Sequence, residues 1–146
     1  MNILSENSRI IELNRQRAGV SYNNLKNYLN MDSIDETSKN KMKSYCRKLP
    51  VLIKTNGLLA ALSFLKGKSK VKKEEGKEGE NEYFYIYSWI ERWLNSMEYI
   101  SEGEIDNDKN IIEKIINANS TNYSIYTKEA IEISIWYKRH VEAMIK

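Results

Sequence analysis

Residues 45–68 read YCRKLPVLIKTNGLLAALSFLKGK, and this stretch decides how the chain folds. It holds the only proline, Pro50, and two of the six glycines, Gly57 in its interior and Gly67 near its end, with basic residues at both ends. Because proline has no N–H to donate and its ring crowds the preceding turn, Pro50 is predicted to end or kink a helix. Proline also suits a first helical turn, so a new helix is predicted to start there. Apolar residues then surround the axis almost completely, which is typical of a central helix. They are Val51, Leu52, Leu58, Leu59, Leu62 and Leu65.

The same helical spacing recurs on both sides of this stretch, whereas the two-residue alternation of strands does not. Met42, Cys46 and Leu49 share one face of a helix that is predicted from residue 35. A last helix is predicted from Thr127, whose hydroxyl would cap it, with Glu129 in its first turn. Further apolar stripes lie at residues 3–18, 22–29, 83–97 and 111–116. The sequence therefore predicts an all-α fold, a single compact bundle of five to six helices in one domain over residues 1–146.

Residues 66–82, KGKSKVKKEEGKEGENE, break the helical pattern. They include three glycines and eleven charged residues, basic first and acidic later, and no aromatic residue. A segment of this composition has too little apolar surface to form a packed structure of its own. We therefore predict one long, mobile charged loop over residues 66–82.

Composition limits the classes of partner and the compartment. The chain is 41% hydrophobic and 29% charged, and its formal net charge of +3 permits a nucleic-acid partner without requiring one. A single cysteine, Cys46, excludes an intramolecular disulfide. No apolar run approaches the roughly 20 residues that span a bilayer, and the first residues lack the pattern of a signal peptide. We expect a cytoplasmic protein that does not contact membranes.

Side chains that carry out chemistry in enzymes form no recognisable site. His140 is the only histidine, and no sequence pattern gives it a nucleophile and an orienting carboxylate. Residues 66–69 end like a phosphate-binding loop, but Leu62 stands where that motif needs its first glycine. Residues 106–117 begin like a calcium loop but lack its glycine and its final glutamate. The sequence predicts no catalytic residue, no metal and no cofactor.

Aromatic and basic residues are the remaining signals. Trp93 and Trp136 are predicted to have structural roles in packing, whereas Tyr85 and Trp89 lie off the apolar stripe and are predicted to face a neighbouring subunit. Basic residues recur beside the predicted helix ends, which favours a surface that contacts phosphates. The residues predicted to bind RNA are Arg15, Arg17, Lys43, Arg47, Lys54, Lys68, Lys138 and Arg139.

Several short motifs resemble the small subunit of the type III-B CRISPR (Cmr) effector complex. In the opening stretch they are Tyr45, Lys48-Leu49-Pro50, Ile53, Asn56-Gly57-Leu58, Ala61-Leu62-Ser63-Phe64-Leu65 and Lys68. Later motifs are Trp93-Leu94, Tyr123, Tyr126-Thr127-Lys128-Glu129-Ala130 and Trp136-Tyr137-Lys138-Arg139. The chain departs from the family at Tyr137, usually leucine, at His140-Val141, usually phenylalanine and alanine, and at Ser124, commonly arginine.

The resemblance implies an all-helical protein without catalytic activity. Several copies would stack head to tail into a minor filament beside the guide RNA–target RNA duplex, next to the backbone and large subunits of the complex. RNA cleavage and cyclic-nucleotide synthesis would belong to other subunits. In such a protein, Pro50 would redirect the chain between two helices, and Gly57 would let a neighbouring backbone approach closely.

Three other interpretations stay open at this point. The chain also fits the small subunit of the type III-A complex, which is helical and forms filaments. A small nuclease or toxin could work through carboxylates such as Glu129 and Glu132. A helical adaptor that binds only proteins is the third.

Overall fold

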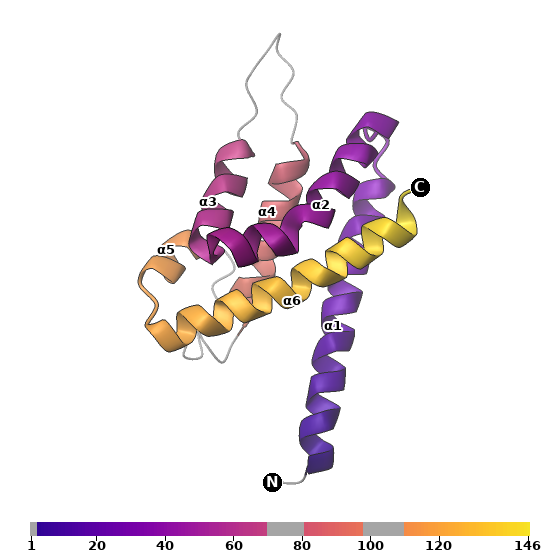
Figure 1. Cartoon of the computed structure of the whole chain (residues 1–146). Helices are drawn as coiled ribbons and strands as arrows, with labels where there is room; N and C mark the ends of the chain where they lie inside the picture. The colour runs from indigo at the N-terminus through magenta and orange to yellow at the C-terminus, as the bar shows by residue number, and fades with distance from the viewer. Residues whose placement is uncertain (1–2, 70–80, 98–109) are drawn as a thin grey trace.

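Six α-helices form the part of the chain that the computed structural model describes, which is residues 3–69, 81–97 and 110–146 (Figure 1). These residues contain no strand, so the prediction of a compact all-α fold is confirmed. The helices are α1 (Ile3–Leu29), α2 (Glu36–Asn56), α3 (Leu58–Lys68), α4 (Glu82–Asn95), α5 (Ile111–Ile116) and α6 (Ser120–Met144). None of the helices within these ranges is both long and apolar enough to cross a membrane.

Short polar side chains mark the start of four helices. The Asp35 carboxylate accepts a hydrogen bond from the backbone N–H of Ser38 at 2.8 Å and so caps α2. This hydrogen bonding lowers the pKa of Asp35. Asn81, Asn110 and Asn119 cap α4, α5 and α6 in the same way. Each cap satisfies an N–H group that has no partner within its own helix.

The first two apolar stripes of the sequence belong to one continuous helix, α1. Its second half packs against α6 and buries Leu25 and Tyr28. Its first half extends away from the other helices (Figure 1), and every side chain of residues 6–12 is exposed. We call residues 6–12 the α1 projection. Ile10 and Ile11 in this projection are 59% and 68% exposed, which leaves an apolar surface open.

The helix boundary in the decisive stretch lies at Gly57. Helix α2 continues through Pro50 to Asn56, so the prediction that one helix ends and another starts at Pro50 is wrong. Pro50 is buried within α2, where its missing N–H leaves the carbonyl of Cys46 without the usual helical donor. Gly57 has φ 85° and ψ 159°, a conformation that is essentially restricted to glycine. The chain therefore turns at the glycine, and α3 begins at the next residue.

The reason for a glycine at position 57 also differs from the predicted one. We expected a neighbouring backbone to approach closely here. Among the described residues, a Cβ atom at Gly57 would meet only the Tyr123 hydroxyl, at 3.7 Å, which is an ordinary contact. The positive φ, and not crowding, therefore requires glycine. The same hydroxyl accepts a 3.4 Å hydrogen bond from the backbone N–H of Leu59, which links the start of α3 to α6.

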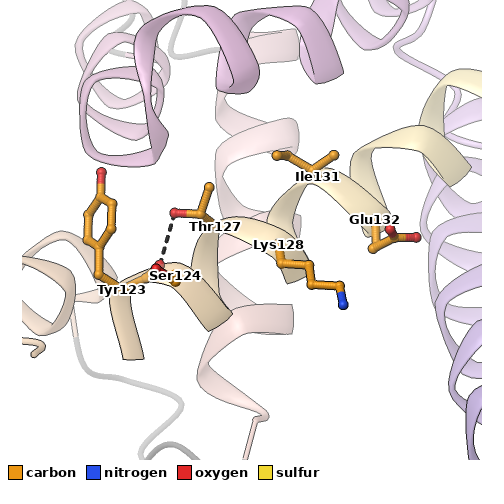
Figure 2. Close-up of a pocket in the computed structure, with 6 residues that line it drawn as sticks. All are labelled: Tyr123, Ser124, Thr127, Lys128, Ile131 and Glu132. Atoms are coloured by element: carbon orange, nitrogen blue, oxygen red, sulfur yellow. Dashed lines mark hydrogen bonds between the residues drawn. The ribbon is translucent and has the colours of Figure 1, made fainter. Parts of the chain in front are cut away.

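The last helix begins at Ser120, well before the predicted cap at Thr127, so that prediction is wrong. The Asn119 side chain caps α6, and Thr127 lies inside the helix. The Thr127 hydroxyl donates a 2.9 Å hydrogen bond to the carbonyl oxygen of Tyr123 (Figure 2). A threonine hydroxyl inside a helix commonly bonds four residues back in this way. Glu129, predicted in the first turn, consequently lies in the middle of α6.

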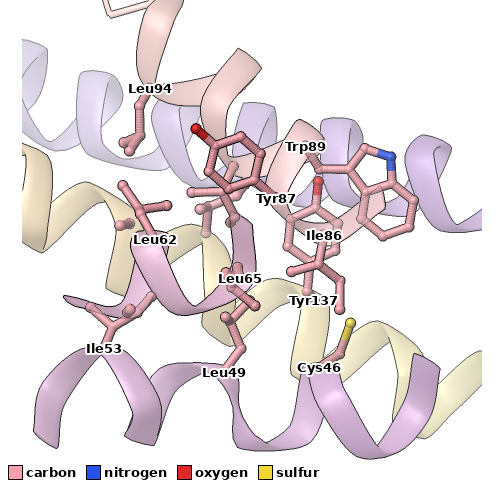
Figure 3. Packing of buried hydrophobic residues seen from close by; sticks show 14 of the residues in the cluster. Cys46, Leu49, Ile53, Leu62, Leu65, Ile86, Tyr87, Trp89, Leu94 and Tyr137 are labelled. Carbon is pink, nitrogen blue, oxygen red and sulfur yellow. The ribbon is translucent and has the colours of Figure 1, made fainter. Parts of the chain in front are cut away.

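A hydrophobic core lies between α2, α3, α4 and α6 (Figure 3). The predicted shared face of Met42, Cys46 and Leu49 is confirmed, because all three side chains are buried. Buried members include Met42, Cys46, Leu49, Leu58, Leu62, Leu65, Ile86, Ile90, Leu94, Ala130, Ile133, Tyr137 and Val141. Val51 is the main exception in the decisive stretch, since it is 63% exposed.

Trp89 belongs to this core, so its predicted place at a subunit interface is wrong. It is 6% exposed, and its ring stacks on Tyr137 with centroids 5.3 Å apart and 7° between the planes. The half-buried ring of Tyr85 lies 5.2 Å from Tyr28 and 6.1 Å from Trp89. Helix α4 packs against α2, α3, α5 and α6. A helix surrounded in this way buries more than one stripe, which explains the error.

The two ends of the predicted loop over residues 66–82 are helical. Helix α3 continues to Lys68, and α4 begins at Glu82. The side-chain N–H of Asn81 donates to the carbonyl oxygen of Lys68 at 2.8 Å, so the end of α3 lies beside the start of α4. The central part of the predicted loop, residues 70–80, lies outside the described residues.

Candidate nucleic-acid interface

A groove between α2 and α6 gathers basic side chains from both helices. Its volume is about 410 Å³. It is lined by Asn40, Lys43, Ser44, Arg47, Lys48, Lys138 and Glu142, and we call it the α2–α6 groove. It brings together three of the residues predicted to bind RNA, Lys43, Arg47 and Lys138, although α2 and α6 are far apart in the sequence.

The α2–α6 groove is cationic and open to solvent. Four of its side chains are cationic and one, Glu142, is acidic. Arg47, Lys48 and Lys138 are exposed, and Lys43 is half-buried. The Arg47 Nε atom lies 3.5 Å from a Glu142 carboxylate oxygen, and both side chains are about half exposed. An ion pair in contact with water contributes only about 0–1 kcal/mol, so Arg47 stays available to a competing anion.

Three other predicted RNA-binding residues are exposed but lie elsewhere. Arg15 is on α1, 3.7 Å from a carboxylate oxygen of Glu12. Lys54 is near the end of α2. Lys68 is at the end of α3, with its Nζ atom 5.9 Å from the Phe64 ring centroid. None of the three lines the α2–α6 groove.

Arg17 is not part of the basic surface, so its predicted contact with RNA is wrong. It is 7% exposed, and its Nε and Nη2 atoms donate to the Glu129 carboxylate at 2.7 and 2.6 Å. Its Nη1 atom donates to Asn14 at 2.8 Å. Trp93 donates its indole N–H to the same carboxylate at 2.9 Å. Through the Glu129 carboxylate, Trp93 links α4 to α6, and Arg17 links α1 to the same group.

Arg139 and Trp136 lie together on α6 but outside the α2–α6 groove. The Arg139 guanidinium lies over the indole of Trp136, 4.8 Å from its ring centroid. Arg139 is exposed and Trp136 is half-buried. Trp136 is not a member of the core cluster formed by the described residues, so its predicted role in core packing is not supported.

The groove contains residues that the sequence analysis did not select. Lys48 contributes a fourth cation, and Asn40 and Ser44 contribute polar groups. A helical wheel of α2 could have predicted these residues. Residues three to four apart share a face of a helix, and Asn40, Ser44 and Lys48 follow one another at that spacing. The partner helix could not be found in this way, because the wheel of one helix does not identify the helix that packs beside it.

A second hollow, with a volume of about 360 Å³, follows the first half of α6 (Figure 2). It is lined by Tyr123, Ser124, Thr127, Lys128, Ile131 and Glu132. Glu129, the other carboxylate considered for a nuclease, does not line it and is held by Arg17 and Trp93. Within the described ranges, no group of three or more His, Cys, Asp or Glu residues could hold a metal ion.

These features define the class of the molecule, a small all-α protein with an exposed cationic groove between two long helices. The chain belongs to the CRISPR-associated protein family Cas_Cmr5, which matches residues 13–144. It is therefore a small subunit of the type III-B (Cmr) class, and the predicted resemblance is confirmed over the type III-A alternative. The family consists of structural subunits of a multi-subunit effector complex that contains RNA.

Proposed function

We propose that this chain is a non-catalytic subunit that holds the guide RNA–target RNA duplex through phosphate contacts in the α2–α6 groove. The observation that supports the proposal is the convergence of Lys43, Arg47, Lys48 and Lys138 from two helices on one open groove. Lysine and arginine side chains bind phosphate oxygens without reading the bases. Such contacts suit a complex that must accept any guide sequence.

One copy of the groove offers few phosphate contacts, so the isolated chain should bind RNA weakly and in a strongly salt-dependent way. Copies aligned in a filament along the duplex would add their contacts through a high effective concentration. The backbone and large subunits would supply the neighbouring surfaces. Arg15, Lys54, Lys68 and Arg139 stay proposed as secondary contacts outside the groove.

The α1 projection is our proposed contact with a neighbouring subunit, and it replaces Trp89 in that role. Ile10 and Ile11 are the reason, because they expose apolar surface on a helix segment that no described element covers. Exposed apolar surface of this kind marks interaction sites in soluble proteins. Tyr85, which keeps part of its ring exposed, stays proposed as a minor contact.

Charge reversal within the groove tests the phosphate contacts. The variant Lys48→Glu changes one exposed groove lysine, and Lys26→Glu is the matched control because Lys26 is exposed on α1 and outside the groove. We expect Lys48→Glu to weaken binding of duplex RNA and to reduce the slope of log K against log salt by about 1 or more.

Binding is measured by fluorescence anisotropy at several salt concentrations, with one duplex and a second of unrelated sequence. Equal losses on both duplexes would support sequence-independent contacts. If Lys26→Glu weakens binding as much as Lys48→Glu, the groove is not the site. Incubation of the purified chain with RNA and divalent metal ions tests the non-catalytic role, and catalytic turnover would contradict it.

A further inference from the structure

An aromatic cluster lies where α1 crosses α6, apart from the α2–α6 groove. It consists of Tyr22 on α1 and Trp136, Arg139 and His140 on α6, and we call it the α1–α6 cluster. The Tyr22 and His140 rings meet edge to face with centroids 5.6 Å apart. The rings of His140 and Trp136 are 5.7 Å apart and tilted by 32°. The Arg139 guanidinium completes the cluster above the indole, at 4.8 Å.

The α1–α6 cluster is held in place although it lies at the surface. The Nε2–H of His140 donates a 3.0 Å hydrogen bond to the carbonyl oxygen of Ala18 on α1. Burial lowers the pKa of His140 and the nearby charge of Arg139 also lowers it, while the hydrogen bond to Ala18 opposes these effects in part. Tyr22 is nevertheless 44% exposed, and Arg139 is exposed. Aromatic surface of this kind is fixed before any ligand arrives.

In this cluster the exposed Arg139 guanidinium, a planar cation, lies over the indole ring of Trp136. Guanidinium planes and aromatic rings are the two surfaces on which proteins stack unpaired nucleobases. Arg139 is adjacent to Lys138, which lines the α2–α6 groove. The groove and the cluster therefore each include one of two consecutive exposed basic residues of α6. A strand whose phosphates contact the groove can direct a base to the cluster.

We propose that the α1–α6 cluster binds an unpaired RNA base, which stacks on the Arg139 guanidinium and the Trp136 indole beneath it. This inference rests on the proposed contact between the α2–α6 groove and RNA. Every base has a flat π face, so the site accepts any sequence. A base inside a regular duplex is covered by its neighbours, so the site selects nucleotides that are bulged, flipped out or single-stranded.

Arg139→Lys separates stacking from simple charge attraction. Lysine keeps the positive charge but lacks the planar group that stacks on a ring. The reverse exchange, Lys26→Arg, is the matched control on an exposed residue of α1 that lies outside both the α2–α6 groove and the cluster. Trp136→Leu removes the indole and gives a second, independent variant. Phe64→Leu is a control for Trp136→Leu. It removes an exposed ring of α3 that lies near the cation of Lys68 on the same helix, away from the cluster.

The probe is an RNA hairpin with one bulged 2-aminopurine, whose emission falls when the base stacks. An otherwise identical hairpin has an abasic site in the bulge. We expect the full chain to bind the first hairpin about 5-fold to 100-fold more tightly than the second and to quench its emission. The two hairpins are compared within each variant, and Arg139→Lys and Trp136→Leu should bind them with nearly equal affinity. Lys26→Arg and Phe64→Leu should keep the preference for the first hairpin.

The results separate this inference from the proposed function. Equal, salt-dependent binding of both hairpins would leave the phosphate contacts intact and overturn the stacking site. An Arg139→Lys variant that keeps the full base preference and quenching would overturn it as well. A chain that binds neither hairpin even at low salt would overturn both proposals.

Discussion

At the scale of single residues, Glu142 sets the charge balance of the α2–α6 groove. It is the only acidic side chain among those that line the groove, and it lies 3.5 Å from Arg47. A phosphate that enters the groove must compete with this carboxylate and is also repelled by it. Glu142 is therefore expected to limit RNA affinity.

The variant Glu142→Gln tests this balance. Because it removes one negative charge and frees Arg47, we expect RNA affinity to rise by up to about 5-fold, the equivalent of one exposed ion pair. The salt slope should become steeper. Glu132→Gln, which changes a carboxylate on the same helix but outside the groove, is the control and should have little effect. Weaker binding by Glu142→Gln would mean that Glu142 positions Arg47 rather than opposing the phosphates.

At the scale of helices and turns, Gly57 separates α2 from α3. Its φ of 85° with ψ of 159° falls in a region that non-glycine residues reach only under strain. We expect Gly57→Ala to lower the free energy of unfolding by about 1–3 kcal/mol. Urea denaturation followed by circular dichroism measures this change.

Gly67→Ala is the matched control for Gly57→Ala. Gly67 lies inside α3, and a Cβ atom there would meet nothing within 4 Å among the described residues. Alanine in such a helical position should raise stability by about 0.5–1 kcal/mol, because glycine loses more conformational freedom on folding. The two Gly→Ala changes should therefore alter the free energy of unfolding in opposite directions. A Gly57→Ala variant as stable as the unmodified chain would show that the turn tolerates a Cβ atom.

The ion pair between Arg17 and Glu129 joins α1 to α6 inside the protein. Glu129→Gln would leave the buried guanidinium without its counter-charge, and we expect a loss of about 3–5 kcal/mol in unfolding free energy. The double variant Arg17→Met/Glu129→Leu buries no charge and should recover part of this loss. The same urea measurement applies.

Arg15→Met is the control for the buried pair. Arg15 pairs with Glu12 at 3.7 Å, but its side chain is 81% exposed, so the change should cost well under about 1 kcal/mol. A double variant that is less stable than Glu129→Gln would show that the pair contributes more than charge compensation.

Local signals predicted some helix ends and missed others for physical reasons. The start of α2 at Asp35 and the buried faces of α4 and α6 follow from capping and from periodic apolar residues. Pro50 was misassigned because a proline within a helix costs about 3 kcal/mol, and burial in the core of the protein offsets that cost here. Thr127 resembled a cap because threonine serves both as a cap and within helices.

At the scale of the whole molecule, the candidate site depends on which helices meet. The sequence predicts Lys43, Arg47 and Lys138 as separate basic residues, but their convergence follows from the packing of α2 on α6. Arg17 had the same local character as Arg15, namely a basic residue on α1. Only the position of Glu129 on α6 decides that one is buried and the other exposed. Such pairings of distant segments are not encoded in local periodicity.

The α1 projection is the feature of the whole molecule that most directly concerns assembly. Burying an isoleucine side chain in an interface contributes about 1.5–3 kcal/mol, whereas a glutamate there would bring an unpaired charge. Ile11→Glu should therefore reduce the number of copies of this chain that enter a reconstituted effector complex. Its own stability should change by no more than about 0.5 kcal/mol, because Ile11 is 68% exposed. Native mass spectrometry of the complex counts the copies.

Ile116→Glu is the matched control for the α1 projection, since Ile116 is 61% exposed but lies on α5. If exposed apolar surface alone governs assembly, both variants should enter the complex in equally reduced numbers. If the projection is the contact with a neighbour, Ile11→Glu should lose copies and Ile116→Glu should keep them. A complex that incorporates Ile11→Glu at full copy number would show that the projection stays in solvent. In that case the helix would extend from the molecule without a partner, and its exposed isoleucines would need another explanation.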